Sequence, residues 1–357
     1  MKNINKAIIA MSGGVDSSVA ALLMKDKGIP CVGITMKLIG DDTLKISPSC
    51  CTDKDIEDAK AVSERLDIPH YVFNFSANFK EKVVDDFVHC YENGMTPNPC
   101  VQCNRYLKFD MLFSEAEKLG GDCVVTGHYA RTEYDEKSGR YLLKKAKDAT
   151  KDQTYVLYSL TQQQLSRAYF PLGEMEKSEV RDLANENGFI NADKKDSQDI
   201  CFIKDCKYFE FIESYTGKSY PEGDFIDTDG KVLGKHKGII RYTVGQGKKL
   251  GLILPEPLYV LDVDPKNNQV ILGKSEELFK TELKANNINL ISVPEIIGEM
   301  RVKAKIRYRQ VEADATVTQT GVDEIKVVFD TPQRAITRGQ SVVLYDGDTV
   351  VGGGTII

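Results

Sequence analysis

The stretch AIIAMSGGVDSSVAALL, residues 7–23, decides the fold of this chain. A short apolar run, typical of a buried strand, leads into a Gly-Gly pair and then into apolar residues at helical spacing. The glycines permit a tight turn that exposes backbone N–H groups, and the positive end of the helix points at that turn. Ser12, Ser17 and Ser18 add hydroxyl donors. The stretch therefore predicts a strand, a pyrophosphate-binding loop and a helix.

Alternating strand and helix patterns continue to about residue 205. They predict further strands at 31–38, 70–75 and 122–130, and helices at 15–28, 54–68, 79–94 and 103–121. Strands separated by helices of this length indicate a parallel sheet with helices on both faces. Beyond residue 205, glycine and short β-rich runs take over, with a hairpin signal in DPKNNQ (264–269). The short runs from residue 283 onward favour a closed barrel.

Three domains are therefore expected: an α/β domain at 1–205, a small β-rich domain at 206–280 and a β-barrel at 281–357. Among the 357 residues, 41% are hydrophobic and 28% are charged, as in ordinary globular proteins. No apolar run reaches the ~18 residues of a membrane span, and the N-terminus lacks a signal-peptide pattern. We expect a cytoplasmic protein without membrane contact.

A basic segment stands out although the net charge is −6. In RVKAKIRYRQ (301–310), Lys or Arg occupies every second position, and on a strand these side chains would share one face. The basic residues are Arg301, Lys303, Lys305, Arg307 and Arg309. Five charges of one sign on one face favour contact with RNA phosphates over a merely solvated strand.

The nine cysteines are too sparse for a disulfide scaffold. Cys31, Cys90 and Cys123 lie among apolar neighbours and are expected in the core, while Cys50 and Cys51 stay unassigned. The pair in TPNPCVQCN (96–104) follows two prolines that stiffen the turn, but it lacks the further ligands of a structural zinc site. Cys103 is expected to begin a helix whose N-terminal field lowers its pKa.

Five sequence motifs resemble those of known protein families. The loop SGGVDSS lacks the GK[ST] ending of a Walker A loop and closely resembles the PP-loop of ATP pyrophosphatases. With TPNPCVQCN, TGHYA, KDQTYVL and SQDICFI in this order, nearly the whole chain resembles the tRNA-specific 2-thiouridylases, the MnmA family. That family adenylates the C2 oxygen of uridine 34 in certain tRNA anticodons and then replaces it with sulfur.

The resemblance implies ATP and Mg²⁺ as cofactors, and tRNA and a sulfur-donor protein, such as a cysteine desulfurase or a sulfur relay, as partners. It implies ATP contacts at Ala10, Met11, Ser12, Gly13, Gly14, Val15, Asp16, Ser17, Met36 and Gly127. It implies tRNA contacts at Asn98, Pro99, Cys100, His128, Lys151, Asp152, Gln153, Arg307, Tyr308 and Gln340. Cys103 matches the family nucleophile, and Cys201 matches the cysteine that carries a persulfide.

One position departs from the family. Many members have a catalytic Asp where this chain has Cys100. Cys100, Cys103 and Cys201 could together hold a [4Fe–4S] cluster with one open iron, and we favour this hypothesis over a persulfide relay. Two other functions stay open: an AMP-forming PP-loop enzyme acting on a small amide or acid, and a non-catalytic iron–sulfur or RNA-binding module. The β-rich C-terminal half disfavours the first, and the intact loop disfavours the second.

Overall fold

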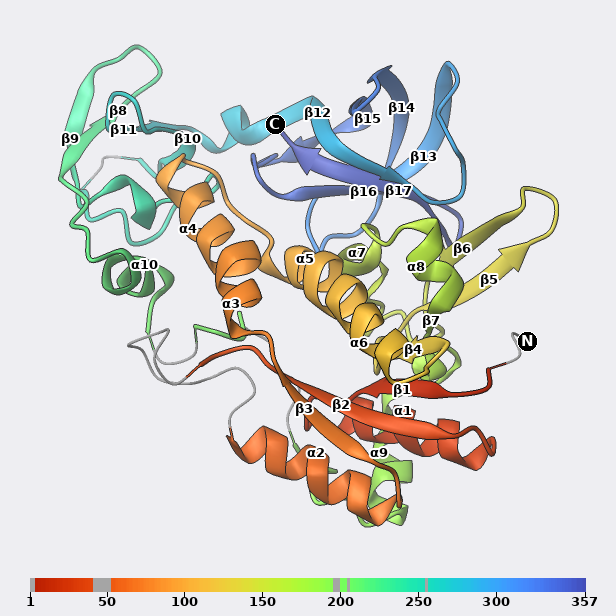
Figure 1. The fold of residues 1–357 in the computed structure, drawn as a ribbon. Helices are drawn as coiled ribbons and strands as arrows, with labels where there is room; N and C mark the ends of the chain where they lie inside the picture. Colours follow the sequence, from red (N-terminus) through yellow and green to blue (C-terminus); the bar gives the residue numbers. More distant parts are fainter. Residues whose placement is uncertain (1–3, 41–52, 195–199, 204–205, 254–255) are drawn as a thin grey trace.

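The computed structural model describes residues 4–40, 53–194, 200–203, 206–253 and 256–357. Three sheets organise the chain: a parallel sheet at the base of Figure 1, a small sheet at its upper left and a barrel at its upper right. Cys50 and Cys51 lie outside the described residues. The predicted class, a parallel-sheet α/β domain followed by two smaller β-rich domains ending in a barrel, is confirmed.

The parallel sheet has five strands and puts β1 at its centre. In spatial order they are β3 (His70–Asn74), β2 (Cys31–Lys37), β1 (Ala7–Ala10), β4 (Cys123–Val125) and β7 (Ala168–Tyr169). Successive residues of β1 face opposite sides, so Ile8 joins one apolar core while Ala7 and Ile9 join the other. Strands β1, β2 and β4 are therefore buried on both faces, which explains their continuous apolar runs, whereas the edge strand β3 is partly exposed.

Helices cover both faces of this sheet, as predicted (Figure 1). One face carries α1 (Val15–Asp26), α2 (Asp53–Arg65) and α9 (Lys177–Glu186). The other carries α3 (Ser76–Phe79), α4 (Asp85–Glu92), α5 (Pro99–Gln102) and α6 (Leu112–Lys118), with π-helical stretches at Lys80–Val84 and Cys103–Met111. The remaining α-helices are α7 (Thr154–Leu157), α8 (Gln162–Arg167) and α10 (Tyr208–Thr216).

The central domain contains a four-stranded sheet in the order β10-β11-β8-β9. Its strands are β8 (Gly223–Ile226), β9 (Val232–His236), β10 (Tyr259–Asp264) and β11 (Gln269–Gly273). The hairpin between β10 and β11 turns at residues 265–268, as the DPKNNQ signal predicts, with Asn268 in the left-handed region at φ 51°. Asn tolerates this conformation better than most residues, which suits the turn.

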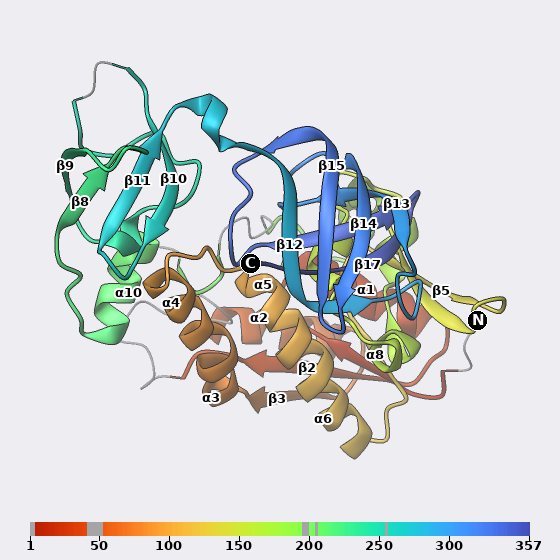
Figure 2. The same ribbon diagram turned by 90° about the horizontal axis from the view of Figure 1, so that it is seen from above.

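The last domain is a closed barrel of six strands. They are β12 (Phe279–Leu290), β13 (Glu299–Lys305), β14 (Ala313–Gly321), β15 (Glu324–Arg334), β16 (Ser341–Asp346) and β17 (Thr349–Ile356). Pairing of β12 with β17 closes the barrel. The hairpin of β5 (Arg131–Asp135) and β6 (Arg140–Lys144), from the N-terminal part of the chain, extends this sheet through the pair Lys144–Thr349 (Figure 2).

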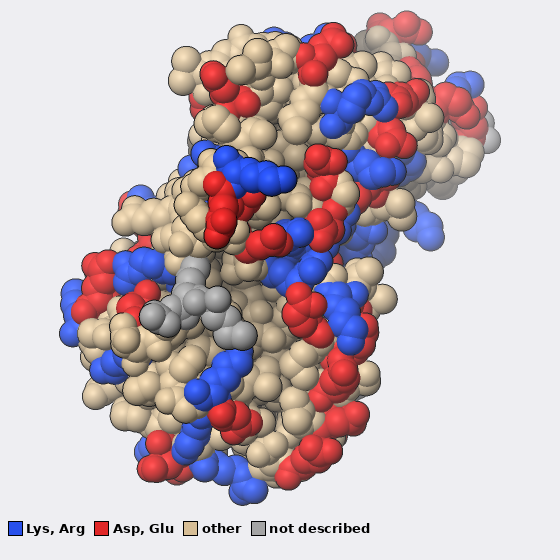
Figure 3. Space-filling view, turned by 90° about the vertical axis from the view of Figure 1, so that its right-hand side faces the viewer, with Lys and Arg blue, Asp and Glu red and all other residues tan. Residues whose placement is uncertain are grey.

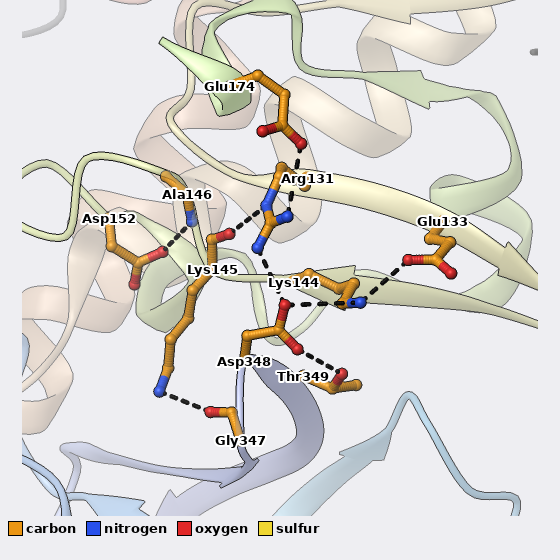
Figure 4. A network of polar contacts seen from close by, with 10 residues as sticks. All are labelled: Arg131, Glu133, Lys144, Lys145, Ala146, Asp152, Glu174, Gly347, Asp348 and Thr349. Carbon is orange, nitrogen blue, oxygen red and sulfur yellow. Dashed lines mark hydrogen bonds and ion pairs between the residues drawn. The ribbon is translucent and has the colours of Figure 1, made fainter. Parts of the chain in front are cut away.

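Ion pairs reinforce this junction (Figure 4). Asp348, in the turn before β17, accepts Arg131 at 3.0 Å and Lys144 at 3.5 Å. Arg131 also approaches Glu174 at 3.4 Å, and Lys145 donates to the carbonyl of Gly347 at 2.9 Å. Because several charges share one cluster, the barrel is fixed to the α/β domain more firmly than one exposed ion pair would fix it.

The single basic face expected over 301–310 was wrong. Strand β13 ends at Lys305, and residues 306–310 form a turn, so Arg307 and Arg309 leave the strand. Two of the charges are neutralised, because Arg301 binds Asp330 through two bonds of 2.8 and 2.6 Å and Lys303 lies 3.3 Å from Asp314. Alternation alone did not reveal where the strand stops.

Positive and negative side chains are interspersed over the face of the molecule seen in Figure 3. This mixture agrees with an acidic chain in which any basic surface is local. Across the described residues, no helix combines the length and the apolar character that crossing a membrane requires.

Candidate active site

The loop between β1 and α1 has an anion-binding conformation. Gly13 adopts φ +71°, and a Cβ there would lie 2.2 Å from the carbonyl oxygen of Asp55. Helix α1 begins after Gly14 with no side chain capping it, so the N–H groups of its first turn have no intrahelical acceptor. The positive end of the α1 dipole adds to this attraction for negative charge. The loop can therefore receive phosphate oxygens on its backbone.

The serines of the loop make hydrogen bonds within the loop itself. The hydroxyls of Ser17 and Ser18 donate to the carbonyl of Gly14 at 2.9 and 3.1 Å, and the backbone N–H of Ser12 donates to Ser17 Oγ at 3.2 Å. Ser18 is fully buried, and its hydroxyl also accepts Asn191 Nδ2 at 2.9 Å. The expectation that Ser18 supplies a donor to the bound anion was therefore wrong, since its hydroxyl stabilises the helix start.

Two lysines that the sequence did not reveal support the loop. Lys194 donates to the Gly13 carbonyl at 2.9 Å and pairs with Asp55 and Asp58 at 2.6 and 2.7 Å. Lys177, on the first turn of α9, lies 2.6 Å from Asp16 Oδ1. Both lysines come from segments far along the chain, where no motif marks them.

Asp16 is held from two sides. Its Oδ1 atom also accepts the hydroxyl of Tyr129 at 2.8 Å, and the Lys177 ammonium lies over the Tyr129 ring, 5.7 Å from its centre. The Lys177 side chain is only 10% exposed, so the ion pair is well shielded from water. This arrangement fixes the Asp16 carboxylate at the start of α1 and pairs its charge with that of Lys177 beside the loop.

The predicted nucleotide residues come together at one edge of the sheet. Met36 lies at the carboxyl end of β2, and Gly127 follows β4, on either side of the loop after β1. A Cβ at Gly127 would lie 2.7 Å from Ser17 N, so only glycine lets this strand end approach α1. Ligands of open α/β sheets bind at such a carboxyl edge, where neighbouring connections diverge.

The paired thiols lie on a helix that starts earlier than predicted. Asn98 caps it, with Val101 N donating to Asn98 Oδ1 at 3.4 Å, and Pro99 occupies the first turn. Cys100 is therefore in the first turn and exposed, while Cys103 lies a turn further and is 8% exposed. The prediction that Cys103 begins the helix was therefore wrong, because the helix starts at Pro99.

The pKa of Cys100 is raised, first because surrounding protein atoms disfavour the thiolate and then because Cys201 is near. Solvent reaches Cys100 although many protein atoms surround it. Cys201 is half-buried and packs against the apolar cluster that contains Cys103. The three predicted sulfur residues thus share one region. Within the described ranges, however, no three His, Cys, Asp or Glu side chains gather closely enough to hold a metal ion.

The barrel holds the thiol-bearing loop in place. Gln340 Nε2 donates to the carbonyls of Thr96 and Pro97 at 3.0 and 2.9 Å. The backbone N–H of Thr96 donates in return to the carbonyl of Arg338 at 2.9 Å. The buried Tyr155 hydroxyl also bonds the barrel, since it donates to the Ser341 carbonyl at 2.9 Å. The loop of residues 96–100 is therefore fixed between two domains.

Arg307 and Tyr308 lie close to this loop. The rings of Tyr308 and Tyr155 are 6.0 Å apart, and Asn98 hydrogen-bonds with Tyr155. Burial raises the pKa of Tyr308 to about 12, with smaller contributions from Asp152 and Cys100. Cys100, Asp152 and Tyr308 are thus neighbours, although they come from three separate stretches of the sequence.

The other predicted tRNA residues are the buried His128 and the half-buried segment 151–153. His128 is buried between Phe109 and Phe170, bonds Thr126 at 2.7 Å, and its pKa is lowered well below the usual value by burial and then by Lys108. Asp152 accepts Ala146 N at 3.0 Å (Figure 4). Gln153 accepts Tyr129 N at 2.9 Å, and Lys151 N donates to the Asp148 carbonyl at 3.1 Å. The segment 151–153 thus links the loop region to the hairpin that joins the barrel.

The parallel sheet, its glycine loop at the carboxyl edge and the uncapped α1 define a PP-loop nucleotide-binding protein. Family profiles match the chain in three consecutive parts: a tRNA methyl transferase HUP domain at 5–205, a tRNA methyl transferase PRC-barrel domain at 209–274 and an aminomethyltransferase β-barrel domain at 280–356.

Curated relatives show to which family within this class the chain belongs. The chain is 51% identical over 352 residues to the tRNA-specific 2-thiouridylase MnmA of Clostridioides difficile (strain 630), covering 98% of each protein. It is 51% identical over 359 residues to MnmA 1 of Thermoanaerobacter sp. (strain X514), covering 100% of this chain and 99% of the relative. The chain therefore belongs to the tRNA-specific 2-thiouridylase family. A solved 4-thiouridine synthetase–RNA complex with ATP is more distant, with 18% identity, TM-score 0.38 and coverage of 55% of this chain and 44% of that one.

Proposed function

We propose that this protein is an ATP-dependent tRNA-uridine 2-sulfurtransferase that acts on uridine 34 of the anticodon. The observation that carries the proposal is the contact of Gln340 with the carbonyls of Thr96 and Pro97. Through it, the barrel holds the thiol-bearing loop near the carboxyl edge where the nucleotide loop opens. A base that enters between the two would meet both an activating group and a sulfur group.

The chemistry requires activation before sulfur transfer. The C2 carbonyl of uracil is a poor electrophile, and its oxygen is a poor leaving group. Attack of that oxygen on the α-phosphorus of ATP would release pyrophosphate and convert the oxygen into part of a phosphate ester, so that AMP can leave. The N–H groups of α1 and the glycine loop would stabilise charge on the departing pyrophosphate. Mg²⁺ bound with the phosphates would supply further stabilisation of that charge.

The residues at the loop fit ATP. Gly13 and Gly127 allow close backbone approach at the loop, since a Cβ would lie 2.2 Å from the Asp55 carbonyl oxygen and 2.7 Å from Ser17 N, and α1 offers uncapped N–H groups. The proposed nucleotide residues run from Ala10 to Ser17, with Met36 and Gly127 beside them. Asp16 is the carboxylate of the loop itself. Lys177 and Tyr129 both bond its Oδ1 atom, so its Oδ2 atom could orient water or metal while the ion pair stays closed.

The sulfur would pass through Cys103 and Cys201, with Cys100 beside them. The cluster hypothesis requires three thiolates around one group, and the present arrangement of described residues does not provide such a set. We therefore take no step through a cluster. In the persulfide route, a sulfur-donor protein loads Cys201, and the terminal sulfur of this persulfide would attack the activated C2 and displace AMP. The Cys103 thiolate would then attack Cys201 Sγ, which releases the thiouridine and leaves a Cys103–Cys201 disulfide for an external thiol to reduce. Cys201 packs against the apolar cluster that contains Cys103, which supports this route.

The residues proposed to contact tRNA fall into groups with different expected roles. Asn98, Pro99 and Cys100 would meet the target base, while Arg307, Tyr308 and Gln340 would hold the strand next to it. His128 and the segment 151–153 would act behind this surface, since they are largely occupied by internal bonds. Phosphate contacts at Arg307 would make tRNA affinity depend on salt.

Exchange of labelled pyrophosphate into ATP, with and without bulk tRNA, tests the proposal. Exchange that requires tRNA is expected, and mass spectrometry of the product should locate sulfur at position 34. Exchange with a small amide or acid and without tRNA would instead support another AMP-forming enzyme. No exchange under any condition would indicate a binding module.

The fate of the sulfur is tested separately. After anaerobic purification, the persulfide route predicts no stoichiometric iron and substantial thiolation activity in Cys100→Ala. An iron count near four per chain, lost in Cys100→Ala together with activity, would establish the cluster route instead.

A further inference from the structure

A pocket of about 350 Å³ lies where the three domains meet. The α/β domain contributes Thr96, the central domain contributes Thr243 and Gly245, and the barrel contributes Arg307, Arg334 and Gln340. This volume is at the lower end of the range for small-molecule sites. Apart from Val244 and Gly245, the lining residues are polar or cationic, and no Asp or Glu is among those that the described chain places there.

Among the residues that the structure describes, no carboxylate pairs with either of the two guanidinium groups in this pocket. Arg307 Nη2 donates to the Ala335 carbonyl at 2.6 Å and approaches Thr337 Oγ1 at 3.4 Å, both neutral acceptors. Arg334 lies over the Tyr259 ring, 5.2 Å from its centre. Within the described residues, neither arginine takes part in an ion pair, unlike Arg301 and Arg338 of the same barrel.

The positive charges of Arg307 and Arg334 also repel each other. Burial lowers the pKa of Arg307, and the positive charge of Arg334 lowers it further. Two unpaired cations that face one space repel each other until an anion enters between them. Guanidinium groups bind phosphate through paired N–H donors, and such bonds are stronger where water is partly excluded.

A glycine keeps this space open. Gly245 adopts φ +90°, and a Cβ there would lie 3.6 Å from Arg334 Nη1 and 3.9 Å from Arg307 Nη2. It would also lie 2.9 Å from the Ala335 Cβ, closer than ordinary contacts. The backbone of the central domain can therefore approach both guanidinium groups, and the absence of a side chain leaves room in front of them.

We propose that this pocket binds one backbone phosphate of the substrate RNA, held between Arg307 and Arg334. The inference rests on the proposed function. It adds Arg334 and the central-domain segment 243–246 to the RNA contacts. Thr96 and Gln340 line the pocket and also fix the loop that leads to Cys100. A phosphate bound here would place its nucleotide beside the thiols, so the pocket sets the position of the strand relative to the reacting sulfur.

The test is the salt dependence of tRNA binding, measured by filter binding with the full-length protein. Loss of one phosphate contact in Arg334→Met should weaken tRNA affinity about tenfold near ~0.1 M KCl and reduce the slope of log affinity against log salt by about 0.7 to 0.9. Arg334→Lys should retain most of the slope. Lys231→Met removes one exposed charge elsewhere in the central domain and should behave as the unaltered protein.

A second variant guards against misfolding of Arg334→Met. Gln246 lines the pocket, and Gln246→Glu adds a negative charge there with almost no change in shape, so tRNA affinity should fall. Because the variant gives up only the exposed bond from Gln246 Nε2 to the Lys248 carbonyl at 3.1 Å, the melting temperature should fall little. Unaltered affinity and slope in both folded variants would overturn the proposal. Failure of the proposed function would look different, because the unaltered protein would then show no tRNA-dependent pyrophosphate exchange, whatever the salt slope of Arg334→Met.

Discussion

The carboxamide of Gln340 donates to the carbonyl oxygen of Thr96 at 3.0 Å, across 244 residues of sequence. This bond connects the barrel to the segment that leads into Cys100. A second bond from the same nitrogen reaches Pro97 at 2.9 Å. The barrel therefore does more than enlarge the surface for RNA, since it positions the loop on which the proposed sulfur chemistry depends.

Removal of this contact should slow thiolation and leave ATP binding unchanged. Gln340→Ala loses two hydrogen bonds of about 1 kcal/mol each, so the rate of thiolation should fall about tenfold or more. Single-turnover thiolation and ATP affinity are the measurements. Gln319→Ala is the matched control, because Gln319 bonds the backbone of Ile296 and Gly321 inside the barrel only. Equal rates in the two variants would contradict the positioning role.

The buried ion pair at the start of α1 should be needed for activation. Lys177→Met removes the cation 2.6 Å from Asp16 and leaves a shielded carboxylate beside the phosphate site. AMP formation should fall about 100-fold, in the range seen when one stabilising donor is removed, with tRNA affinity unchanged.

Lys147→Met is the control for that experiment, since the ion pairs of Lys147 with described residues are exposed ones, of 3.5 Å with Glu179 and 4.0 Å with Glu176. If Lys177→Met formed AMP as fast as this control, the ion pair would have no role in activation.

Close packing at the end of β4 should make Gly127 intolerant of a side chain. In Gly127→Ala, the new Cβ would lie 2.7 Å from Ser17 N and from the carbonyl carbon of Asp16, so α1 must shift. ATP affinity measured by calorimetry should fall at least tenfold. Gly321→Ala, where the Cβ would meet Glu324 Cβ at an ordinary 3.6 Å, should bind ATP normally. Normal ATP binding by Gly127→Ala would show that this edge does not hold the nucleotide.

The raised pKa of the Cys100 thiol should be measurable from the pH dependence of its alkylation. The surrounding protein atoms and the nearby Cys201 raise the pKa of Cys100, so its thiol stays protonated in the folded protein at pH values where an ordinary thiol ionises. Alkylation by iodoacetamide, followed at the peptide that contains Cys100, should show a midpoint at higher pH than in the denatured chain. A lower midpoint in the folded protein would indicate an activated thiolate and contradict the assignment.

The sequence predicted much of the fold because its strongest patterns are local. The strand, loop and helix over residues 7–26 depend on glycine conformation and on apolar spacing within one segment. The hairpin at 265–268 likewise depends on its own turn residues. Such features need no knowledge of the rest of the chain, and the structure confirms them.

Features that depend on distant partners could not be predicted. Lys177 and Lys194 resemble any surface lysine in sequence, and only the folded chain brings them to Asp16 and Gly13. The prediction of one strand over 301–310 was wrong because the end of β13 is set by its pairing with β14 and β16. This pairing stops at Lys305. The pocket at Arg334 likewise exists only because three domains meet there.

The most direct measurement of the central claim follows the oxygen that leaves the uridine. A substrate tRNA carrying the heavy isotope of oxygen at C2 of uridine 34 is converted in a single turnover, and the released AMP is analysed by mass spectrometry. If the enzyme adenylates that oxygen, the label must appear in the phosphate group of AMP in proportion to the thiouridine formed. Thiouridine formed with unlabelled AMP would contradict adenylation of the C2 oxygen and, with it, the proposed reaction.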